Sequence, residues 1–506
     1  MAETLPCPRH GEAAMDATRL APYGRLGRMR TAYGVETVRA AERELMARLP
    51  DGALMQRAAA GLAAACADLL GRVYGSRVVL LIGSGDNGGD ALYAGARLAR
   101  RGAGVTAVLP APDRAHAGGL AALRRAGGRP VGLDAAEELI ERADLVVDGI
   151  VGIGGKGGLR PDAAPLADAA ARSGAAVVAV DLPSGVDADT GEVRGAAIRA
   201  DLTVTFGTHK PGLLIDPARE YAGVVRLVDI GLALPADATE LEALQHADVA
   251  RLLPLPGAET DKYRRGVVGI AAGSSRYPGA AVLAVAGALR GGAGAVRYVG
   301  PAADAVIARF PETLVSDRGP KKAGRVQAWV VGPGAGDDAA TVAEVLATDV
   351  PVLLDADGLR LADAGAVRDR GAPTLMTPHA GEAAALLGVS REEVEGARLA
   401  SVRELARRYA ATVLLKGSTT LVARAGGAGA VRVNPTGTGW LATAGSGDVL
   451  SGLGGSLLAA GLPAVDAASV AAYLHGLSAR FAADGAPLGA HDVAEGIPEA
   501  WRDVRG

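Results

Sequence analysis

A glycine-rich stretch near the end of the chain closes on an acidic residue and runs directly into an apolar segment. Residues 434–452 read NPTGTGWLATAGSGDVLSG. The main-chain amides of residues 444–447, with the start of a following helix, would form a cradle for an anion. Asp448 follows that cradle, where its carboxylate can accept a proton from a hydroxyl while the amides hold a phosphoryl group. The stretch predicts phosphoryl transfer to an alcohol, although the P-loop lysine is absent and many such residues only cap helices.

Further polar segments in the second half of the chain lie at the ends of expected strands. Lys416 ends a strand in VLLKGSTTLV, residues 413–422, and is predicted to contact the edge of a nucleotide. His379 stands at a strand-to-helix turn in LMTPHAGEAAAL, where a ligand contact is favoured over a core histidine. Two more glycine turns are VVGPGAGDD at 330–338 and DKYRRGVVGIAAGSSRYPGAA at 261–281. Together these segments strengthen the prediction of a phosphoryl-transfer site.

The first half of the chain carries glycines with the spacing of a dinucleotide-binding motif. GSGDNGGD, residues 83–90, follows the apolar run RVVLLI and precedes the helical run ALYAGARLARR. Asp86 and Asp90, however, bring carboxylates to the place where a pyrophosphate needs amide donors and no repulsion. The next expected strand ends in VLPAP and lacks the acid that would hold a ribose. The motif therefore predicts a ligand other than the phosphates of a dinucleotide.

Oxygen-bearing side chains follow three expected strands of this first half. Asn87 and Asp90 come after one strand, Asp148 after another, and Asp181 and Ser184 after a third. Ligands of an open α/β sheet bind at the carboxyl ends of its strands, and such oxygens suit a group-one or group-two cation. Helix capping is the alternative for each acid alone. Asp181 ends a buried strand, which predicts a catalytic or substrate-binding carboxylate for proton transfer there.

The elements that must position these residues alternate along the chain. Short β-branched runs alternate with alanine- and leucine-rich amphipathic runs, which predicts α/β units with mainly parallel sheets. Further helices are expected from about residue 448 and from about residue 464, and a proline-rich, aperiodic stretch at 231–260 indicates a domain boundary. The expected strands lie at 78–82, 105–109, 145–147, 176–180, 202–206 and 224–228, then at 267–271, 295–299, 327–331, 352–355, 374–376, 413–415 and 420–422.

Composition limits the class of protein. The 506 residues, 49% of them hydrophobic, suffice for two or three domains, and a net charge of -3 gives no indication of a nucleic-acid partner. Glycine, proline or charge interrupts the longest apolar runs, so no membrane span is predicted. Cys7 and Cys66 lie far apart without nearby histidine pairs, which is typical of a cytoplasmic protein. Residues 1–28 lack the apolar core of a secretory signal and are expected to form a disordered leader; Met29 as the start, or a basic targeting peptide, are the alternatives.

Four motifs of the first half together resemble the NAD(P)H-hydrate epimerase family, over roughly residues 29–230. They are GDNGGDAL, VVDGIVGIGGKGGLRP, VDLPSGVDADTG and ADLTVTFGTHKPGL. The resemblance implies a Rossmann-like domain that interconverts the R and S forms of hydrated NADH and NADPH and binds potassium. It implies that the potassium ligands are Asn87, Asp148 and Ser184. It also implies that the hydrate contacts Asp86, Asn87, Gly88, Gly89, Asp90, Gly152, Ile153, Gly154, Gly155, Lys156, Gly157, Gly158 and Asp181.

The motifs of the second half resemble the ribokinase-like superfamily and, more closely, the ADP-dependent NAD(P)H-hydrate dehydratase family, over about residues 247–502. The resemblance implies that ADP, with magnesium, phosphorylates the C6 hydroxyl of the S hydrate. Phosphate then leaves, and NADH or NADPH is regenerated with AMP. By matching positions, the hydrate would contact Ala280, Gly334, His379 and Asp448. The nucleotide would contact Lys416, Gly417, Ser418, Thr419, Thr420 and Gly447.

The expected organisation is a Rossmann-like three-layer epimerase domain at 29–235, a linker at 236–246 and a ribokinase-like three-layer dehydratase domain at 247–506. The expected partners are the small molecules NADHX, NADPHX and ADP, with neither nucleic acid nor membrane. One alanine-rich helix, expected over residues 38–70, suggests packing against a second subunit in a homo-oligomer. Two alternatives stay open: a sugar or vitamin kinase with a regulatory first domain, and a non-catalytic binding module in place of the epimerase.

Overall fold

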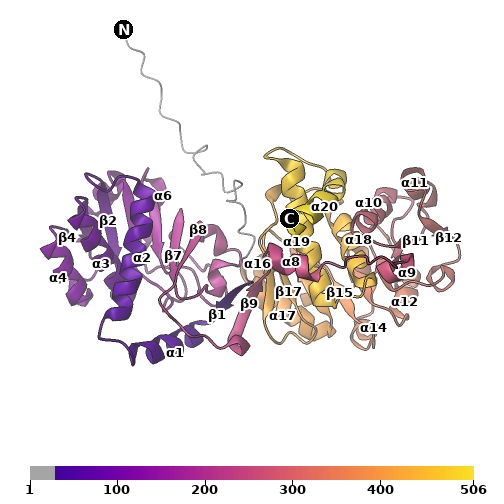
Figure 1. The fold of residues 1–506 in the computed structure, drawn as a ribbon, viewed down its shortest axis with the longest axis horizontal. Helices are drawn as coiled ribbons and strands as arrows, with labels where there is room; N and C mark the ends of the chain where they lie inside the picture. Colours follow the sequence, from indigo (N-terminus) through magenta and orange to yellow (C-terminus); the bar gives the residue numbers. More distant parts are fainter. Residues whose placement is uncertain (1–28) are drawn as a thin grey trace, which may run out of the picture. The chain divides into compact units, whose positions relative to one another are not determined.

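The computed structural model describes residues 29–506, so the leader expected at 1–28 lies outside the described residues. The chain forms two compact units (Figure 1). Unit 1 contains Tyr33–Leu213 and Pro217–Ala238. Unit 2 contains Thr239–Gly506 and two short earlier segments, residues 29–32 and Leu214–Asp216.

Unit 1 is built on a sheet of seven described strands in the order β4-β3-β2-β5-β6-β7-β8, with every neighbouring pair parallel. The central strands are buried along nearly their whole length, as expected for a parallel sheet covered on both faces. The strands are β2 (Arg77–Ile82), β3 (Gly104–Val108), β4 (Arg129–Val131), β5 (Leu145–Gly149), β6 (Ala176–Val180), β7 (Leu202–Phe206) and β8 (Val224–Val228).

Alternating strand residues of unit 1 face two separate cores. Leu80 packs with helices α2 (Ala53–Leu70) and α3 (Asp86–Arg100) on one face. Leu81 packs with α5 (Ala136–Glu141) and α6 (Ala164–Arg172) on the other. The remaining helices are α1 (Val35–Met46), α4 (Ala117–Arg125) and α7 (Arg219–Ala222). The result is a three-layer α/β unit, as the sequence predicted.

The single helix expected over residues 38–70 is wrong, because α1 ends at Met46 and α2 begins at Ala53. Pro50 lacks an amide for a continuing helix, and Gly52 takes φ 75°, a left-handed conformation that favours glycine. Helix α2 is the one described helix long and apolar enough to cross a membrane by length and composition alone. It packs against α3 and strand residues of unit 1, so its apolar face belongs to a protein core.

Unit 2 is built on a sheet of eleven described strands in the order β1-β9-β18-β17-β16-β15-β14-β13-β10-β11-β12. From β16 to β12 the neighbouring strands run parallel, whereas β17 is antiparallel to both of its neighbours. The strands are β1 (Arg30–Tyr33), β9 (Thr239–Ala243), β10 (Val267–Ala271), β11 (Ala295–Val299), β12 (Leu314–Ser316), β13 (Ala328–Val331), β14 (Val352–Leu354), β15 (Thr374–Met376), β16 (Thr412–Leu415), β17 (Thr420–Ala423) and β18 (Val431–Asn434).

Helices cover both faces of this sheet and again give three layers. One face packs against α8 (His246–Leu252), α10 (Pro278–Arg290), α18 (Ser446–Ala459), α19 (Ala464–Ala483) and α20 (Ala490–Arg505). The other packs against α12 (Ala339–Leu346), α15 (Ala380–Leu387), α16 (Arg391–Gly396) and α17 (Arg398–Tyr409). The short helices α9 (Lys262–Arg265), α11 (Ala303–Arg309), α13 (Asp357–Leu361) and α14 (Ala364–Arg368) complete the unit.

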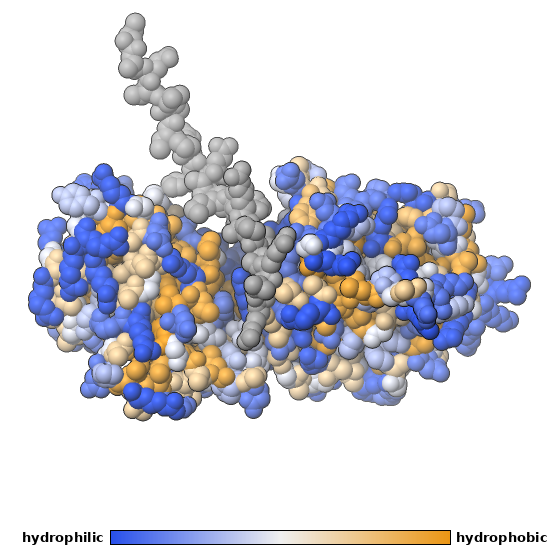
Figure 2. Space-filling model, in the orientation of Figure 1, coloured by the Kyte–Doolittle hydropathy of each residue, from blue (hydrophilic) through white to orange (hydrophobic). Residues whose placement is uncertain are grey.

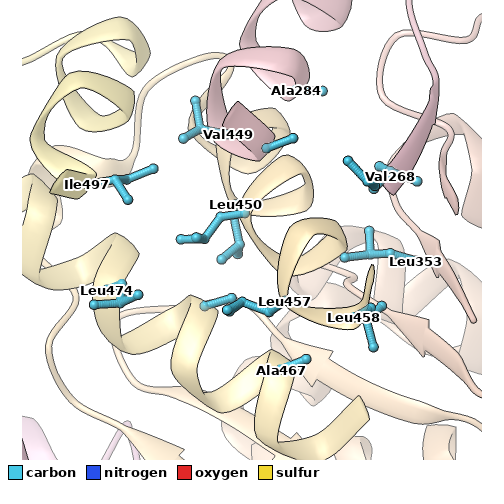
Figure 3. Close-up of a cluster of buried hydrophobic side chains, with 14 of the residues drawn as sticks. Val268, Ala284, Leu353, Val449, Leu450, Leu457, Leu458, Ala467, Leu474 and Ile497 are labelled. Atoms are coloured by element: carbon cyan, nitrogen blue, oxygen red, sulfur yellow. The ribbon is translucent and has the colours of Figure 1, made fainter. Parts of the chain in front are cut away.

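Helix α18 is the central helix of its face. Figure 3 shows its Leu450 between Ile497 and Leu474 on one side and the sheet residues Val268 and Leu353 on the other. Because the apolar side chains that follow Asp448 are fixed in this core, the first turn of α18 is held at the sheet edge. The polar end of the helix is therefore positioned by packing rather than by its own capping.

The segment expected to be aperiodic at 231–260, with a linker at 236–246, is ordered. It contains β9, which pairs in parallel with β18, and α8, which packs in the core of unit 2. The sequence TELEA of β9 lacks the β-branched run typical of a strand, so tertiary pairing decides its conformation. The strands β4, β12 and β18 are likewise short or contain proline, and they were not expected from the pattern.

On the face shown in Figure 2, hydrophilic and apolar residues are interspersed over both units. The chain carries 53 lysine and arginine residues against 56 aspartate and glutamate residues, so its charges nearly balance.

Candidate functional site

Polar side chains of unit 1 converge where β2, β5 and β6 end side by side. Helix α3 begins at Asp86, five residues earlier than the sequence suggested, so the motif DNGGD forms the first turn of the helix. The glycines permit this close start: a Cβ at Gly88 would lie 2.3 Å from the carbonyl oxygen of Gly83. The motif thus places Asn87 and Asp90 on a helix rather than on a loop.

Asp148 and Ser184 form a buried hydrogen-bonded pair. The Ser184 hydroxyl donates to Asp148 Oδ1 at 2.6 Å and the Ser184 amide donates to Oδ2 at 2.7 Å. Both residues are fully buried. Burial raises the pKa of Asp148 to about 6, although these hydrogen bonds oppose the shift.

Asn87 comes close to the loop that follows Asp148. Its Nδ2 donates to the Val180 carbonyl at 2.6 Å. Its Oδ1 faces Gly152, where a Cβ would lie 2.3 Å from that oxygen. An amide carbonyl, a carboxylate and a hydroxyl therefore meet at one sheet edge, and this set of hard oxygen donors fits a monovalent cation.

Asp181 is held by several donors. Lys210 Nζ donates to Asp181 Oδ1 at 2.5 Å, the Thr205 hydroxyl at 3.0 Å and the Phe206 amide at 3.2 Å. Lys210 and Asp181 are both buried, and Asp181 has φ 66°, a left-handed conformation unusual for a residue with a side chain. The sequence predicted the carboxylate but missed Lys210, whose signal was a lone lysine four residues after the end of a buried strand.

A cavity of about 430 Å³ lies beside this group of acids. Its polar lining comprises Glu42, Asp51, Gln56, Asp86, Asp90, Tyr93 and His116. Burial raises the pKa of Asp90 well above its usual range, and the charges of Asp181, Asp86 and Glu42 add to the effect. Burial raises the pKa of Glu42 as well, although Lys210 opposes this shift. Sequence reasoning missed Glu42, Tyr93 and His116, which come from separate elements.

The expected hydrate-binding residues of unit 1 divide between two places. Asp86 and Asp90 line the cavity, whereas the loop at residues 152–158 does not. Gly152 adjoins Asn87, Gly154 adjoins the Arg39 guanidinium, and Lys156 is exposed. The structure therefore does not bring the loop into this cavity. The loop follows β5, and β5 lies on the opposite side of β2 from β3, the strand that precedes α4.

In unit 2, Asp448 lies in the first turn of α18, directly after the glycine stretch. Gly445 precedes the helix with φ 88°, a conformation that favours glycine. Burial raises the pKa of Asp448 to about 7, with further raising by Asp355 and Glu382 and an opposing effect of Lys416. The free amides of this helix start lie beside a carboxylate that changes its protonation near neutral pH.

Lys416 is anchored beside this turn. Its Nζ donates to Asp355 Oδ1 at 2.7 Å and lies 3.7 Å from Glu382 Oε2. Asp355 is 1% exposed, and its Oδ2 accepts from the Ser451 hydroxyl at 2.7 Å. Burial lowers the pKa of Lys416, but Asp355 and Glu382 outweigh it, so the pKa is raised. A Cβ at Gly447 would lie 3.4 Å from Lys416 Nζ, which brings the lysine against the cradle.

The other expected hydrate contacts of unit 2 lie shortly after β13 (Gly334), shortly after β15 (His379) and in the first turn of α10 (Ala280). Gly334, with φ 61°, approaches Ala280 so closely that a Cβ there would lie 2.7 Å from the alanine Cβ. His379 caps α15, where its Nδ1 accepts from the Glu382 amide at 3.1 Å and its side chain remains 60% exposed. It borders a cavity of about 620 Å³ that Glu382, Asp357 and Arg360 also line.

Hydrogen bonds to Asp216 fix the turn from Lys416 to Thr420. The Thr419 amide and hydroxyl donate to Asp216 Oδ2 at 2.9 and 2.8 Å, and the Ser418 hydroxyl donates to it at 2.5 Å. Thr419 is fully buried, so in place of the expected nucleotide contact it has a structural one. Gly417 and Ser418 are exposed, and Thr420 is half-buried. Arg398 donates to the carbonyls of Lys416 and Thr419 at 3.1 and 2.9 Å, a second brace that the sequence did not indicate.

His475 supports the glycine stretch from α19. Its Nε2 lies 2.9 Å from the Ser446 carbonyl oxygen and donates to it. Burial lowers the pKa of His475 to about 4, so the ring is neutral at pH 7 and keeps this donor role. No local signal marks this histidine, because its helix is apolar and its partner lies 29 residues away.

Comparisons with known proteins agree with the two units. A family model described as NAD(P)H-hydrate dehydratase matches residues 268–498, and one described as YjeF-related protein N-terminus matches residues 51–212. The chain is 51% identical to the bifunctional NAD(P)H-hydrate repair enzyme Nnr of Mycobacterium leprae, over 90% of this chain and 94% of that protein. It is 36% identical to the protein of the same name from Corynebacterium glutamicum, over 94% and 99%.

Among solved structures, an ADP/ATP-dependent NAD(P)H-hydrate dehydratase of Bacillus subtilis, co-crystallized with ATP/Mg2+, is 29% identical, with a TM-score of 0.47. The match covers 51% of this chain and 97% of that one. Both units match family models in the expected order, and relatives similar over almost their full length carry one name. The chain therefore belongs to the bifunctional NAD(P)H-hydrate repair enzymes, which pair an epimerase with a dehydratase.

Proposed function

We propose that unit 1 epimerises the R and S hydrates of NADH and NADPH and that unit 2 dehydrates the S hydrate with ADP. The observation that carries the second assignment is the placement of Asp448 at a helix start, beside an anchored lysine. A carboxylate that titrates near pH 7 is suited to accept a proton from an alcohol. Neighbouring amides and a fixed cation suit a phosphoryl group in transfer.

In unit 2, Asp448 takes the proton of the C6 hydroxyl group. The oxygen of that hydroxyl group attacks the terminal phosphorus of ADP. The O–P bond forms, and AMP leaves. The C6–O bond then breaks with phosphate as leaving group, while the lone pair of the ring nitrogen forms a double bond to C6. Loss of a proton from C5 restores the reduced nicotinamide. Phosphate is a far better leaving group than hydroxide, so the nucleotide makes water loss possible.

The remaining residues position the reactants. Lys416, fixed by Asp355, neutralises charge on the transferred group, and the amides up to Gly447 hold its oxygens. His379, Gly334 and Ala280 border the hydrate, whereas Gly417, Ser418 and Thr420 border the nucleotide. A magnesium ion usually keeps water ligands and binds through phosphates and one or two carboxylates, which Glu382 beside Lys416 fits. The ion would supply charge neutralisation on the phosphates.

In unit 1, the fixed carboxylate of Asp181 provides a negative charge for a ring that gains positive character at C6 during inversion. Asn87, Asp148 and Ser184 would hold a potassium ion through their oxygens. That ion would supply positive charge and order the ends of β2, β5 and β6. The hydrate lies against Asp86 and Asp90, which line the cavity of unit 1.

We further propose that the enzyme works as a homo-oligomer in the cytoplasm, with no nucleic-acid partner. Cys66, a buried free thiol, is compatible with a reducing compartment. Light scattering of the purified chain tests the oligomer: a mass of about one chain contradicts it.

The function is tested by giving the purified chain a mixture of R and S hydrates with ADP. We expect the absorbance of reduced nicotinamide to recover from both hydrates, with AMP and phosphate formed in equal amounts. Asp448→Asn should lower dehydration about 10²- to 10⁴-fold, whereas Asp304→Asn, in an exposed position on α11, should not. Phosphorylation of sugars or vitamins with ATP, without hydrate turnover, would instead support the kinase alternative.

A further inference from the structure

Two carboxyl groups from different elements border the cavity of unit 1. Asp90 lies on α3 and Glu42 on α1. Asp90 is 7% exposed, and its Oδ1 is buried without a hydrogen-bond partner among the described residues. A buried polar atom left unpaired is costly, so this oxygen is a candidate to meet a ligand.

The surroundings of Asp90 differ sharply from those of Asp181. Asp181 has Lys210 and two further donors at one oxygen. The charged groups that influence Asp90 are all acidic: Asp181, Asp86 on its own helix, and Glu42 on α1. Burial is the largest cause that raises the pKa of Asp90, and these acidic neighbours raise it further. One carboxyl group is thus paired with a buried lysine, whereas the other keeps an oxygen without a partner among the described residues.

His116 and Tyr93 complete the polar wall of this cavity. His116 caps α4, and its Nδ1 accepts from the Gly119 amide at 3.0 Å, which leaves Nε2 as the donor of the ring. The rings of Tyr93 and His116 meet edge to face, 5.7 Å apart. Neither side chain forms a hydrogen bond with the free oxygen of Asp90.

We propose that Asp90 and Glu42 are the two proton carriers of the epimerase, an assignment that rests on the proposed function of unit 1. Asp90 gives its proton to the C6 hydroxyl oxygen, the C6–O bond breaks, and water leaves while the ring nitrogen's lone pair forms a double bond to C6. Water then adds to the opposite face of C6, that electron pair returns to nitrogen, and Glu42 takes the released proton. Inversion in the other direction uses the same groups in reverse.

This chemistry explains why two carboxyl groups are needed, one to donate a proton and one to accept a proton. Hydroxide leaves poorly, so the departing oxygen must be protonated, and the entering water must lose a proton on the other face. The cation formed at C6 lies near the fixed carboxylate of Asp181. The apolar lining from Leu54, Met55, Phe206 and Ile230 suits the ring itself.

The test measures interconversion of pure R hydrate to S by the full chain without ADP, which silences dehydration. Asp90→Asn and Glu42→Gln should each slow inversion about 10²- to 10⁴-fold. Asp168→Asn, exposed on α6, is the matched control and should not. In water enriched in ¹⁸O, the inverted hydrate should carry one solvent oxygen at C6. Thermal unfolding of each variant, compared with the wild-type chain, checks that unit 1 is folded.

Inversion at the wild-type rate by Asp90→Asn would overturn the proposal, and so would an inverted product that retains its original oxygen. Loss of the decline at high pH in Asp90→Asn, where the wild type loses activity as Asp90 ionises, would support it. If the wild-type chain does not interconvert the hydrates at all, the proposed function of unit 1 fails instead.

Discussion

Lys416 Nζ lies 2.7 Å from Asp355 Oδ1, and the other oxygen of the same carboxylate accepts from Ser451 of α18. One buried acid thus connects the strand end that carries Lys416 to the helix that carries Asp448. The distance between the cation and the proposed base is therefore set by Asp355, a residue that needs no contact with substrate.

Asp355→Ala should leave the Lys416 cation with a weaker partner. Breaking a buried ion pair costs about 3–5 kcal/mol, and since Lys416 keeps 19% exposure we expect about 2–3 kcal/mol of lost unfolding free energy. Dehydration should fall at least about tenfold. Urea unfolding and steady-state kinetics measure both effects. Asp369→Ala, which loses only an exposed pair with Arg368, should change stability by less than about 0.5 kcal/mol.

Dehydration should become faster as pH rises through about 7. Burial, followed by the charges of Asp355 and Glu382, raises the pKa of Asp448 to about 7. The carboxylate accepts a proton only when it is ionised, so the rate should be low at acid pH and level off above the pKa. The turnover number at saturating ADP and S hydrate, measured from about pH 5.5 to about pH 8.5, checks this. A rate that falls over this range would contradict the role of Asp448 as a base.

Asp216→Ala should weaken nucleotide binding, although Asp216 itself does not contact the nucleotide in the proposed site. Three donors of the turn at Ser418 and Thr419 lose their common acceptor, and hydrogen bonds to a charged group contribute about 1.5–3 kcal/mol each. We expect the Kd for ADP to rise about tenfold or more, measured by calorimetry. Ser418→Ala, which removes one donor, should have the smaller effect. An unchanged Kd in a folded Asp216→Ala chain would show that the turn is rigid without this brace.

Removal of potassium should slow epimerisation only. The oxygens of Asn87, Asp148 and Ser184 fit a monovalent cation, so dialysis into a tetraalkylammonium salt should lower the rate of R to S conversion, and added potassium should restore it. Dehydration of pure S hydrate in the same sample is the control. Equal loss of both activities would indicate a general salt effect instead.

The fold was largely predictable because hydrophobic periodicity is local. Every strand expected from the pattern is present with ends within two residues, for example β6 at Ala176–Val180. The strand β9 was not predicted, because the sequence TELEA takes its extended conformation only by pairing with β18. The break between α1 and α2 was visible as Pro50 and Gly52 but was outweighed by the alanine-rich pattern on either side.

The sequence by itself determined which residues can do chemistry: the carboxylate of Asp448 behind its glycines, Asp181 and Asp90 at strand ends, and Lys416 after β16. These signals are local, since each is a residue type at the end of a strand or the start of a helix. Only the tertiary structure decided their states. Lys210 reaches Asp181 from 29 residues away, whereas nothing pairs with the buried Oδ1 of Asp90 among the described residues. Burial and partners fix protonation, and both depend on which strand ends and helices the fold brings together.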